Sequence, residues 1–326
     1  MKKIGLLLFS IGLTSLLLSS CSNYNMRKDN NSSISTKTSN EEENIMYKKI
    51  QGIDATYLIM NPDPVFGSTA TIIEKNGKGL LVDTQFSKKD ADKIVQLVKS
   101  NNIDIETIYI SYSDPDYYFG TNQIKKSFPK ANVVATASTI SRIKDTYKSK
   151  LSVWADTLKE NAPDKIIIPN EIKESINLED VEFEIFGNDI KKQTLYNKND
   201  QLLVGGILVS TGSHLFMADT KSIDSQLQWI NDLSELESLS LRTVIPGHFE
   251  AGNQFMPQNI KFTKEYIEKF ITAEKESKVS SEIITNLMFS ILLYKVGRIL
   301  IRITTLYLIS KCIFLLQLLQ ELVHRW

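Results

Sequence analysis

Histidine and cysteine are scarce in this chain of 326 residues. The histidines are His214, His248 and His324, and the cysteines are Cys21 and Cys312. Two cysteines are too few for a disulfide scaffold or a cysteine-rich zinc site. The small number of imidazoles limits every metal or acid–base hypothesis for this chain.

An excess of charge of one sign is also absent. Lysine and arginine total 38, and aspartate and glutamate total 38 as well. Without a basic excess, the composition gives no reason to expect a nucleic acid as partner. Hydrophobic residues make up 42% and charged residues 23%, which is typical of a globular protein. The chain as a whole is therefore neither disordered nor a multi-span membrane protein, and it is long enough for one large core.

Residues 1–21 have the composition of an export signal. Two lysines precede an apolar stretch, residues 4–18, that is too short for an ordinary transmembrane helix. The run Leu18-Ser19-Ser20-Cys21 follows and resembles the bacterial lipobox, whose cysteine becomes the lipid-modified first residue of the mature protein. This resemblance implies a lipoprotein signal peptide and export to the bacterial cell envelope, with a membrane anchor on Cys21. A plain signal peptide with a chance cysteine is the alternative.

Two further segments flank the predicted globular domain, residues 46–282. Residues 22–45 are rich in Ser, Asn, Thr and Lys and have few apolar side chains, which predicts a flexible tether. Residues 283–320 contain no Asp or Glu, and basic residues interrupt a run rich in Leu and Ile. A membrane-associated helix, out-of-frame sequence and a buried terminal helix each explain the tail, residues 283–326. The sudden loss of acidic residues favours the second explanation.

Strand and helix signals alternate between residues 46 and 282, which predicts an α/β domain. Asn76-Gly77 has turn chemistry and separates two β-prone runs. Ser87, followed by Asp90 three residues later, predicts the start of a helix. Strands are expected at 69–73, 79–82, 105–110, 133–135, 181–186, 202–209, 214–217 and 243–245. Helices are expected from residue 87, and at 121–128, 137–158, 224–239 and 262–276.

Several pieces of this domain together resemble the metallo-β-lactamase fold superfamily. In chain order they are Leu80-Leu81-Val82-Asp83-Thr84, Ile108-Tyr109-Ile110-Ser111, Phe119-Gly120 and Val244-Ile245-Pro246-Gly247-His248. The resemblance runs from about residue 57 to about residue 276. It implies an α/β fold of αββα sandwich type, in which two mixed sheets face each other and helices cover the outsides. It also implies an active site on loops at one edge of the sheets. Most members are hydrolases with one or two zinc ions, so the resemblance implies that activity as well.

Most of the family's metal-binding histidines are missing from this sequence. The family has His-x-His-x-Asp-His after a strand, where this chain has Tyr112-Ser113-Asp114-Pro115-Asp116-Tyr117. A tyrosine phenol, with an ordinary pKa of about 10, is a poor replacement for imidazole. Asp114 could bind a hard cation, because carboxylates suit such ions. The same run is also explained as a loop, with proline fixing φ and aspartate capping the next helix.

The remaining ligand positions leave alternatives open. Asp189 stands where the next family histidine is expected. The bridging aspartate is either Asp219 or is replaced by Ile207, and the spacing to His248 favours Ile207. The resemblance thus implies a set of candidate metal ligands, of which Asp116 and His248 are also the candidate catalytic residues. The full set is Asp114, Asp116, Asp189, Asp219 and His248.

These patterns favour a membrane-anchored protein with a degenerate metal site and a non-catalytic or ligand-binding role. Its partner would be a small molecule or an envelope component, and no cofactor is then required. The alternative is a metal-dependent hydrolase with an altered, carboxylate-rich centre for one ion, either zinc or another divalent metal. A structural envelope protein that uses the fold only as scaffold is a third class.

Overall fold

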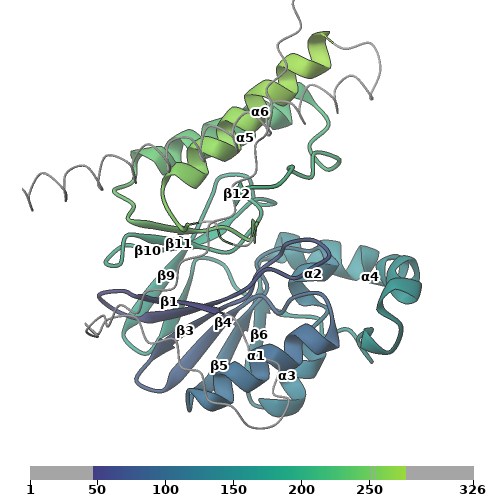
Figure 1. The fold of residues 1–326 in the computed structure, drawn as a ribbon, viewed down its shortest axis with the longest axis vertical. Coiled ribbons are helices and arrows are strands. Elements are labelled where there is room, and N and C mark those ends of the chain that lie inside the picture. Colours follow the sequence, from purple (N-terminus) through teal and green to yellow (C-terminus); the bar gives the residue numbers. More distant parts are fainter. Residues whose placement is uncertain (1–46, 251, 253, 277–326) are drawn as a thin grey trace, which may run out of the picture. The chain divides into compact units, whose positions relative to one another are not determined.

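The computed structural model describes residues 47–250, 252 and 254–276. The predicted signal peptide with Cys21, the tether and the tail lie outside the described residues. The described part forms an α/β arrangement of sheets and flanking helices (Figure 1). None of its helices is both long and apolar enough to cross a membrane.

The larger sheet has seven strands within the described residues, in the order β1-β2-β3-β4-β5-β6-β7. Neighbours from β1 to β4 are antiparallel, and neighbours from β4 to β7 are parallel. The strands are β1 (Tyr47–Gln51), β2 (Thr56–Met60), β3 (Thr71–Lys75), β4 (Lys78–Val82), β5 (Asp104–Tyr109), β6 (Asn132–Ala135) and β7 (Asn170–Glu171). The predicted turn at Asn76-Gly77 joins β3 to β4, and both residues have positive φ.

The smaller sheet has five strands in the described part of the chain, in the order β13-β11-β10-β9-β8. Only β11 and β13 are parallel neighbours, so this sheet is mixed as well. The strands are β8 (Ser175–Leu178), β9 (Val181–Phe186), β10 (Thr194–Asn197), β11 (Leu202–Val204) and β13 (Thr243–Ile245). Two short strands, β12 (Ser210–Thr211) and β14 (His248–Phe249), form a separate parallel pair.

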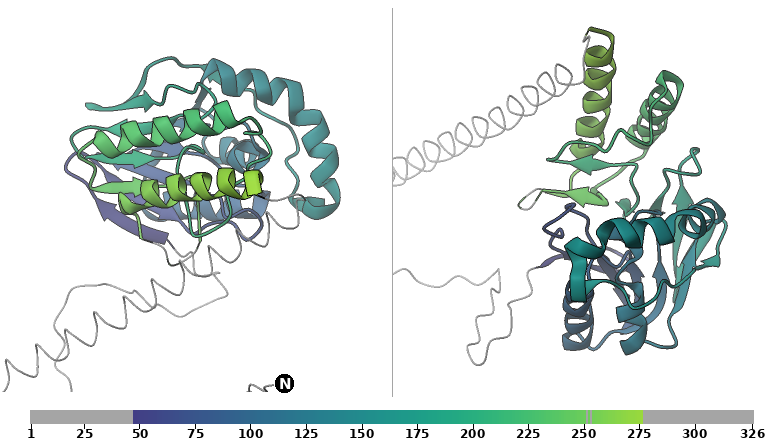
Figure 2. Two further views of the ribbon diagram at one scale, coloured as in Figure 1. Left: turned by 90° about the horizontal axis from the view of Figure 1, so that it is seen from above. Right: turned by 90° about the vertical axis from the view of Figure 1, so that its right-hand side faces the viewer.

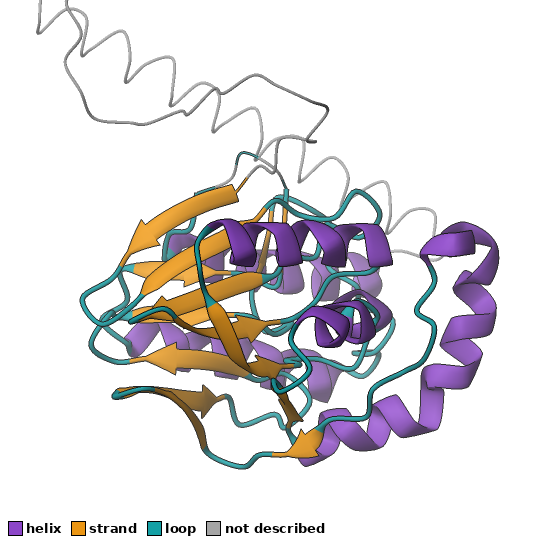
Figure 3. Cartoon of the chain, turned by 90° about the horizontal axis from the view of Figure 1, so that it is seen from below, coloured by secondary structure: helices purple, strands orange, loops and turns teal. Residues whose placement is uncertain are grey.

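Helices cover the outer faces of the two sheets (Figures 1 and 3). The larger sheet carries α1 (Lys88–Ser100), α3 (Thr121–Ser127) and α4 (Ala137–Leu158), while the short α2 (Pro115–Tyr118) precedes α3 and the 3-10 turn η1 (Lys159–Asn161) follows α4. The smaller sheet carries α5 (Ile223–Ser238) and α6 (Gln258–Glu276), which run side by side (Figure 2). Ser87 caps α1 as predicted, since its hydroxyl accepts a hydrogen bond from the Asp90 amide at 3.1 Å.

The alternation of side chains along the strands divides the core into three clusters. Leu80 and Val82 lie in the cluster between the two sheets, whereas Leu81 packs with the helices of the larger sheet. On the smaller sheet, Val204 joins the cluster between the sheets and Leu203 packs against α5 and α6. Successive strand residues point to opposite faces, so a strand with helices on one side and a sheet on the other is apolar throughout.

Two predictions about strands were wrong. The strand expected at 202–209 ends at Val204, because Gly205 and Gly206 adopt positive φ and leave the extended conformation. The segment 214–217 is a loop. Its alternation of buried Leu215 and Met217 with exposed Phe216 imitates a strand, but the buried side chains pack against the α5–α6 cluster.

Candidate functional site

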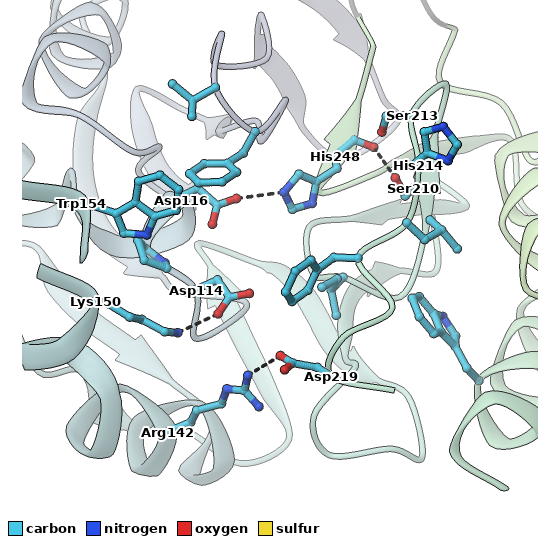
Figure 4. A pocket seen from close by; sticks show the side chains of 17 residues that line it. Asp114, Asp116, Arg142, Lys150, Trp154, Ser210, Ser213, His214, Asp219 and His248 are labelled. Carbon is cyan, nitrogen blue, oxygen red and sulfur yellow. Dashed lines mark hydrogen bonds and ion pairs between the residues drawn. The ribbon is translucent and has the colours of Figure 1, made fainter. Parts of the chain in front are cut away.

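A cavity of about 610 Å³ lies beside the segments that follow β5, β11 and β13 (Figure 4). Helix α4 supplies Arg142, Lys150 and Trp154 to its wall. The other side chains used below come from the loop after β2, the start of α2, the segment after β11 and the beginning of β14. They are Val65, Phe66, Asp114, Asp116, Ile207, Ser210, Ser213, Phe216, Asp219 and His248.

Two glycines allow the segments after β11 and β13 to approach each other closely. Gly206 has a φ of +75°, and a Cβ atom there would lie 1.9 Å from the backbone oxygen of Gln193. A Cβ atom on Gly247 would lie 2.1 Å from the backbone oxygen of Gly206. Since neither position can hold a side chain without moving the backbone, these glycines bring Ile207 and His248 to the same cavity.

His248 lies between two side chains of α2. Its Nε2 is 2.8 Å from Asp116 Oδ2, and its Nδ1 is 3.0 Å from the hydroxyl oxygen of Tyr117. Burial by itself would lower the pKa of His248, but the hydrogen bond and charge of Asp116 outweigh it and raise the pKa. The imidazole is therefore held as one member of a hydrogen-bonded Asp–His–Tyr group.

The other two carboxylates of the cavity pair with cations from α4. Lys150 Nζ lies 2.7 Å from Asp114 Oδ1, and Arg142 forms an ion pair with Asp219 (Figure 4). Asp219 also accepts a hydrogen bond from the Tyr112 hydroxyl at 3.4 Å. Although Asp114 precedes α2, its side chain makes no capping hydrogen bond, so the capping explanation of this residue was wrong.

Asp83, which follows β4, is hydrogen-bonded to the segment that follows β5. It is buried and accepts two hydrogen bonds from Ser111, from the amide at 2.8 Å and from the hydroxyl at 2.6 Å. The Ser111 hydroxyl in turn accepts a hydrogen bond from the Gly206 amide at 2.8 Å, which joins the two sheets. Burial raises the pKa of Asp83 to about 8.

The structure brings four of the five predicted metal ligands to one cavity. Asp114, Asp116, Asp219 and His248 all line it, but each is bonded to a side chain of the same chain. Asp189 does not line the cavity, and its carboxylate binds the Lys191 amide at 2.9 Å and Lys192 Nζ at 3.0 Å.

The donor set does not fit a zinc centre. Among the described residues, no three or more His, Cys, Asp or Glu side chains form a group that could hold a metal ion. Tyr112 and Tyr117 stand at two of the imidazole positions that the resemblance implies, and their rings pack edge to face with centroids 5.4 Å apart. Burial raises the pKa of both phenols, so neither ionises readily to serve as a ligand.

The positions proposed for the bridging aspartate lie on different parts of the cavity. Ile207 directly follows the two glycines after β11 and packs in the same apolar cluster as Tyr112 and Tyr117. Asp219 lies twelve residues further along, where it binds Arg142. Neither position therefore offers an unpaired carboxylate to the cavity, since Ile207 is apolar and Asp219 is ion-paired.

The contribution of α4 was missed by sequence reasoning. Lys150 and Trp154 are spaced i, i+4, which makes them neighbours on one helix face, and Arg142 precedes Lys150 by eight positions, roughly two turns. That spacing was a usable signal for a shared face. It does not identify what the face contacts, because that depends on segments far away in the sequence.

The described region has the α/β fold of metallo-β-lactamase structures, with two mixed sheets and flanking helices. The chain is similar to the metallo-β-lactamase DIM-1, with a TM-score of 0.50 and 17% identity over 69% of this chain and 97% of that one. It is similar to the metallo-β-lactamase IND-7, with a TM-score of 0.50 and 16% identity over 70% of this chain and 100% of that one.

FIM-1 from Pseudomonas aeruginosa, solved in a mono-zinc form, has a TM-score of 0.48 and 15% identity, over 69% of this chain and 95% of that one. No protein-family model and no curated protein sequence matches the chain. The similarity to DIM-1 and IND-7 confirms the predicted fold class, and at these identities it shows the fold alone.

Proposed function

We propose that this protein is a metallo-β-lactamase-fold protein whose cavity binds a small molecule and does not hydrolyse substrates through a zinc centre. One observation carries the proposal. The three carboxylates that line the cavity are each bonded to a basic side chain or histidine of the same chain, namely Lys150, Arg142 and His248.

These ion pairs and the Asp116–His248 hydrogen bond disfavour the binding of a divalent metal ion in the cavity. A metal bound by Asp114 or Asp219 would lie close to the ammonium of Lys150 or the guanidinium of Arg142, and like charges repel strongly in a partly buried site. A metal bound by Asp116 and His248 would first have to break their direct hydrogen bond. The same carboxylates that sequence reasoning selected as ligands are better explained as partners in ion pairs and a hydrogen bond.

The cavity supports a binding role by its size and composition. Its volume of about 610 Å³ lies within the range of roughly 300–1,000 Å³ that is typical of small-molecule sites. Aromatic and aliphatic side chains share the wall with polar and charged ones, so a ligand there would meet both apolar surface and hydrogen-bonding groups.

We further propose that the protein sits in the bacterial cell envelope, anchored by a lipid on Cys21. The support is the run Leu18-Ser19-Ser20-Cys21 after a short apolar stretch. This location does not depend on the proposed chemistry of the cavity, so each can be tested without the other.

Elemental analysis of the purified full-length protein, produced in zinc-supplemented medium, tests the metal-free proposal. We expect far less than one zinc per chain and no β-lactam or ester hydrolysis above background. The triple variant Tyr112→His/Asp114→His/Tyr117→His should raise the zinc content, because it restores imidazole donors. One or two tightly held ions in the unaltered protein, lost together with hydrolytic activity in His248→Ala, would instead establish the altered hydrolase.

A further inference from the structure

We infer that the cavity selects an uncharged molecule with a planar aromatic ring. The inference rests on the proposed small-molecule role of the same cavity and specifies its ligand. It is carried by the combination of an aromatic wall, exposed apolar side chains at that wall, and charged groups that neutralise one another.

Aromatic side chains form one part of the wall. Phe66 and Trp154 both line the cavity and pack edge to face with ring centroids 5.0 Å apart. Phe86 supports them from behind, with its ring centroid 4.9 Å from that of Phe66 and 5.5 Å from that of Trp154. Three rings held in mutual contact make a rigid surface, against which a flat ring packs with little loss of side-chain entropy.

Two apolar side chains at the cavity remain accessible to water. Val65 is 51% exposed and Phe216 is 59% exposed, and both line the cavity. They come from different loops, one after β2 and one after β12. A ligand that contacts these side chains would remove part of their apolar surface from water, which favours an apolar occupant.

The charges of the cavity leave little attraction for an ionic ligand. Asp114 is paired with Lys150, and Asp219 is paired with Arg142. An anionic ligand would have to compete with these carboxylates for the cations, and a cationic ligand would have to compete with the cations for the carboxylates. An uncharged ligand avoids both costs. The Ser213 hydroxyl offers it a neutral hydrogen-bonding partner, and the Ser210 hydroxyl, which donates to the backbone oxygen of His248 at 3.3 Å, can still accept.

A matched series of three probes tests the inference on the full-length protein. The probes are 2-naphthamide, 2-naphthoate and 2-naphthylmethylammonium, which share one ring system and differ in charge. Binding is measured by calorimetric titration, with a blank titration into the same detergent buffer. We expect 2-naphthamide to bind at least tenfold more tightly than either charged probe.

Two surface variants locate the binding. Phe216→Ser should weaken 2-naphthamide binding by roughly tenfold or more, because burial of a phenylalanine is lost. Ile190→Ser is the matched control, since Ile190 is 62% exposed and does not line the cavity, and its binding should not change. Both replaced side chains are exposed, so neither variant should prevent folding.

The outcomes separate this inference from the proposed function. Tighter binding of a charged probe that still depends on Phe216 would overturn the ligand class and leave a ligand-binding cavity. Absence of measurable binding by all three probes, or binding that Phe216→Ser does not weaken, would overturn the inference at this site. Zinc content, measured separately, decides whether the centre holds a metal.

Discussion

At the scale of single residues, the cavity differs from a metal centre by what its carboxylates contact. Asp114 and Lys150 are only partly exposed, with 22% and 18% of their side chains accessible. Breaking such a pair by removing one partner leaves the other charge without compensation in a partly buried place. The two pairs therefore join α4 to the segments it faces at the cavity.

Asp83 provides a pH-dependent prediction at the same scale. Its folded-state pKa of about 8 lies above the ordinary aspartate pKa of 3.8. Between these values the unfolded chain has released the proton while the folded protein keeps it, so the free energy of unfolding contributed by Asp83 falls as pH rises. Above about pH 8 both states are ionised and this contribution stops changing.

Replacement of Asp83 with asparagine should remove the part of the fall in the free energy of unfolding with pH that Asp83 causes. We expect urea unfolding between pH 4.5 and 7.5, roughly the interval of this titration, to show a flatter pH dependence for Asp83→Asn than for the unaltered protein. Asp156→Asn is the control for the same chemical change at an exposed position of α4. Parallel curves for Asp83→Asn and the unaltered protein would show that Asp83 does not titrate in this range.

At the scale of elements, local signals determine where several helices begin. Helix α1 starts after Ser87, whose hydroxyl satisfies the Asp90 amide and also donates to the Asp90 carboxylate at 2.6 Å. Ala91, Ile94, Leu97 and Val98 then form the buried face that sequence periodicity predicted. Both features depend on residues close in the chain, which is why they could be predicted.

Replacing Ser87 with alanine should destabilise the protein by about 1 kcal/mol, because the first turn of α1 loses its side-chain acceptor. Chemical denaturation at constant pH measures the change in the free energy of unfolding. Ser87→Thr keeps a hydroxyl and should recover most of the loss. Equal stability of the alanine and threonine variants would mean that the hydrogen bond is not responsible for the effect.

At the scale of the whole molecule, the amino-terminal run determines the proposed location. Cys21→Ala should abolish labelling of the protein with radioactive palmitate, because the thiol that receives the lipid is gone. We also expect the variant to accumulate as the unprocessed precursor. If Cys21→Ala were processed and retained in the membrane like the parent, a lipid anchor on Cys21 would be contradicted. Cys312→Ala is the matched control for the loss of a thiol.

The order of the elements and several of their bounds followed from sequence. Helix α4 spans Ala137–Leu158 and β9 spans Val181–Phe186, as predicted, because periodicity over many residues indicates an element. Seven short strands of the described residues were not identified, namely β1, β2, β7, β8, β10, β12 and β14. Short strands carry few periods of the pattern, and their pairing partners are set by the sheet rather than by neighbours in the chain.

The sequence by itself was enough to predict the fold class and to name several residues that line the cavity, since Asp116, Ile207 and His248 come shortly after recognisable strand ends. Only the tertiary structure decided their partners. Lys150 and Asp114 are separated by 36 positions, Arg142 and Asp219 by 77, and Asp116 and His248 by 132. Such contacts arise when packed sheets and helices bring distant segments together. For that reason the candidate ligands could be named from the sequence. The ion pairs and the hydrogen bond that these side chains form could not be predicted.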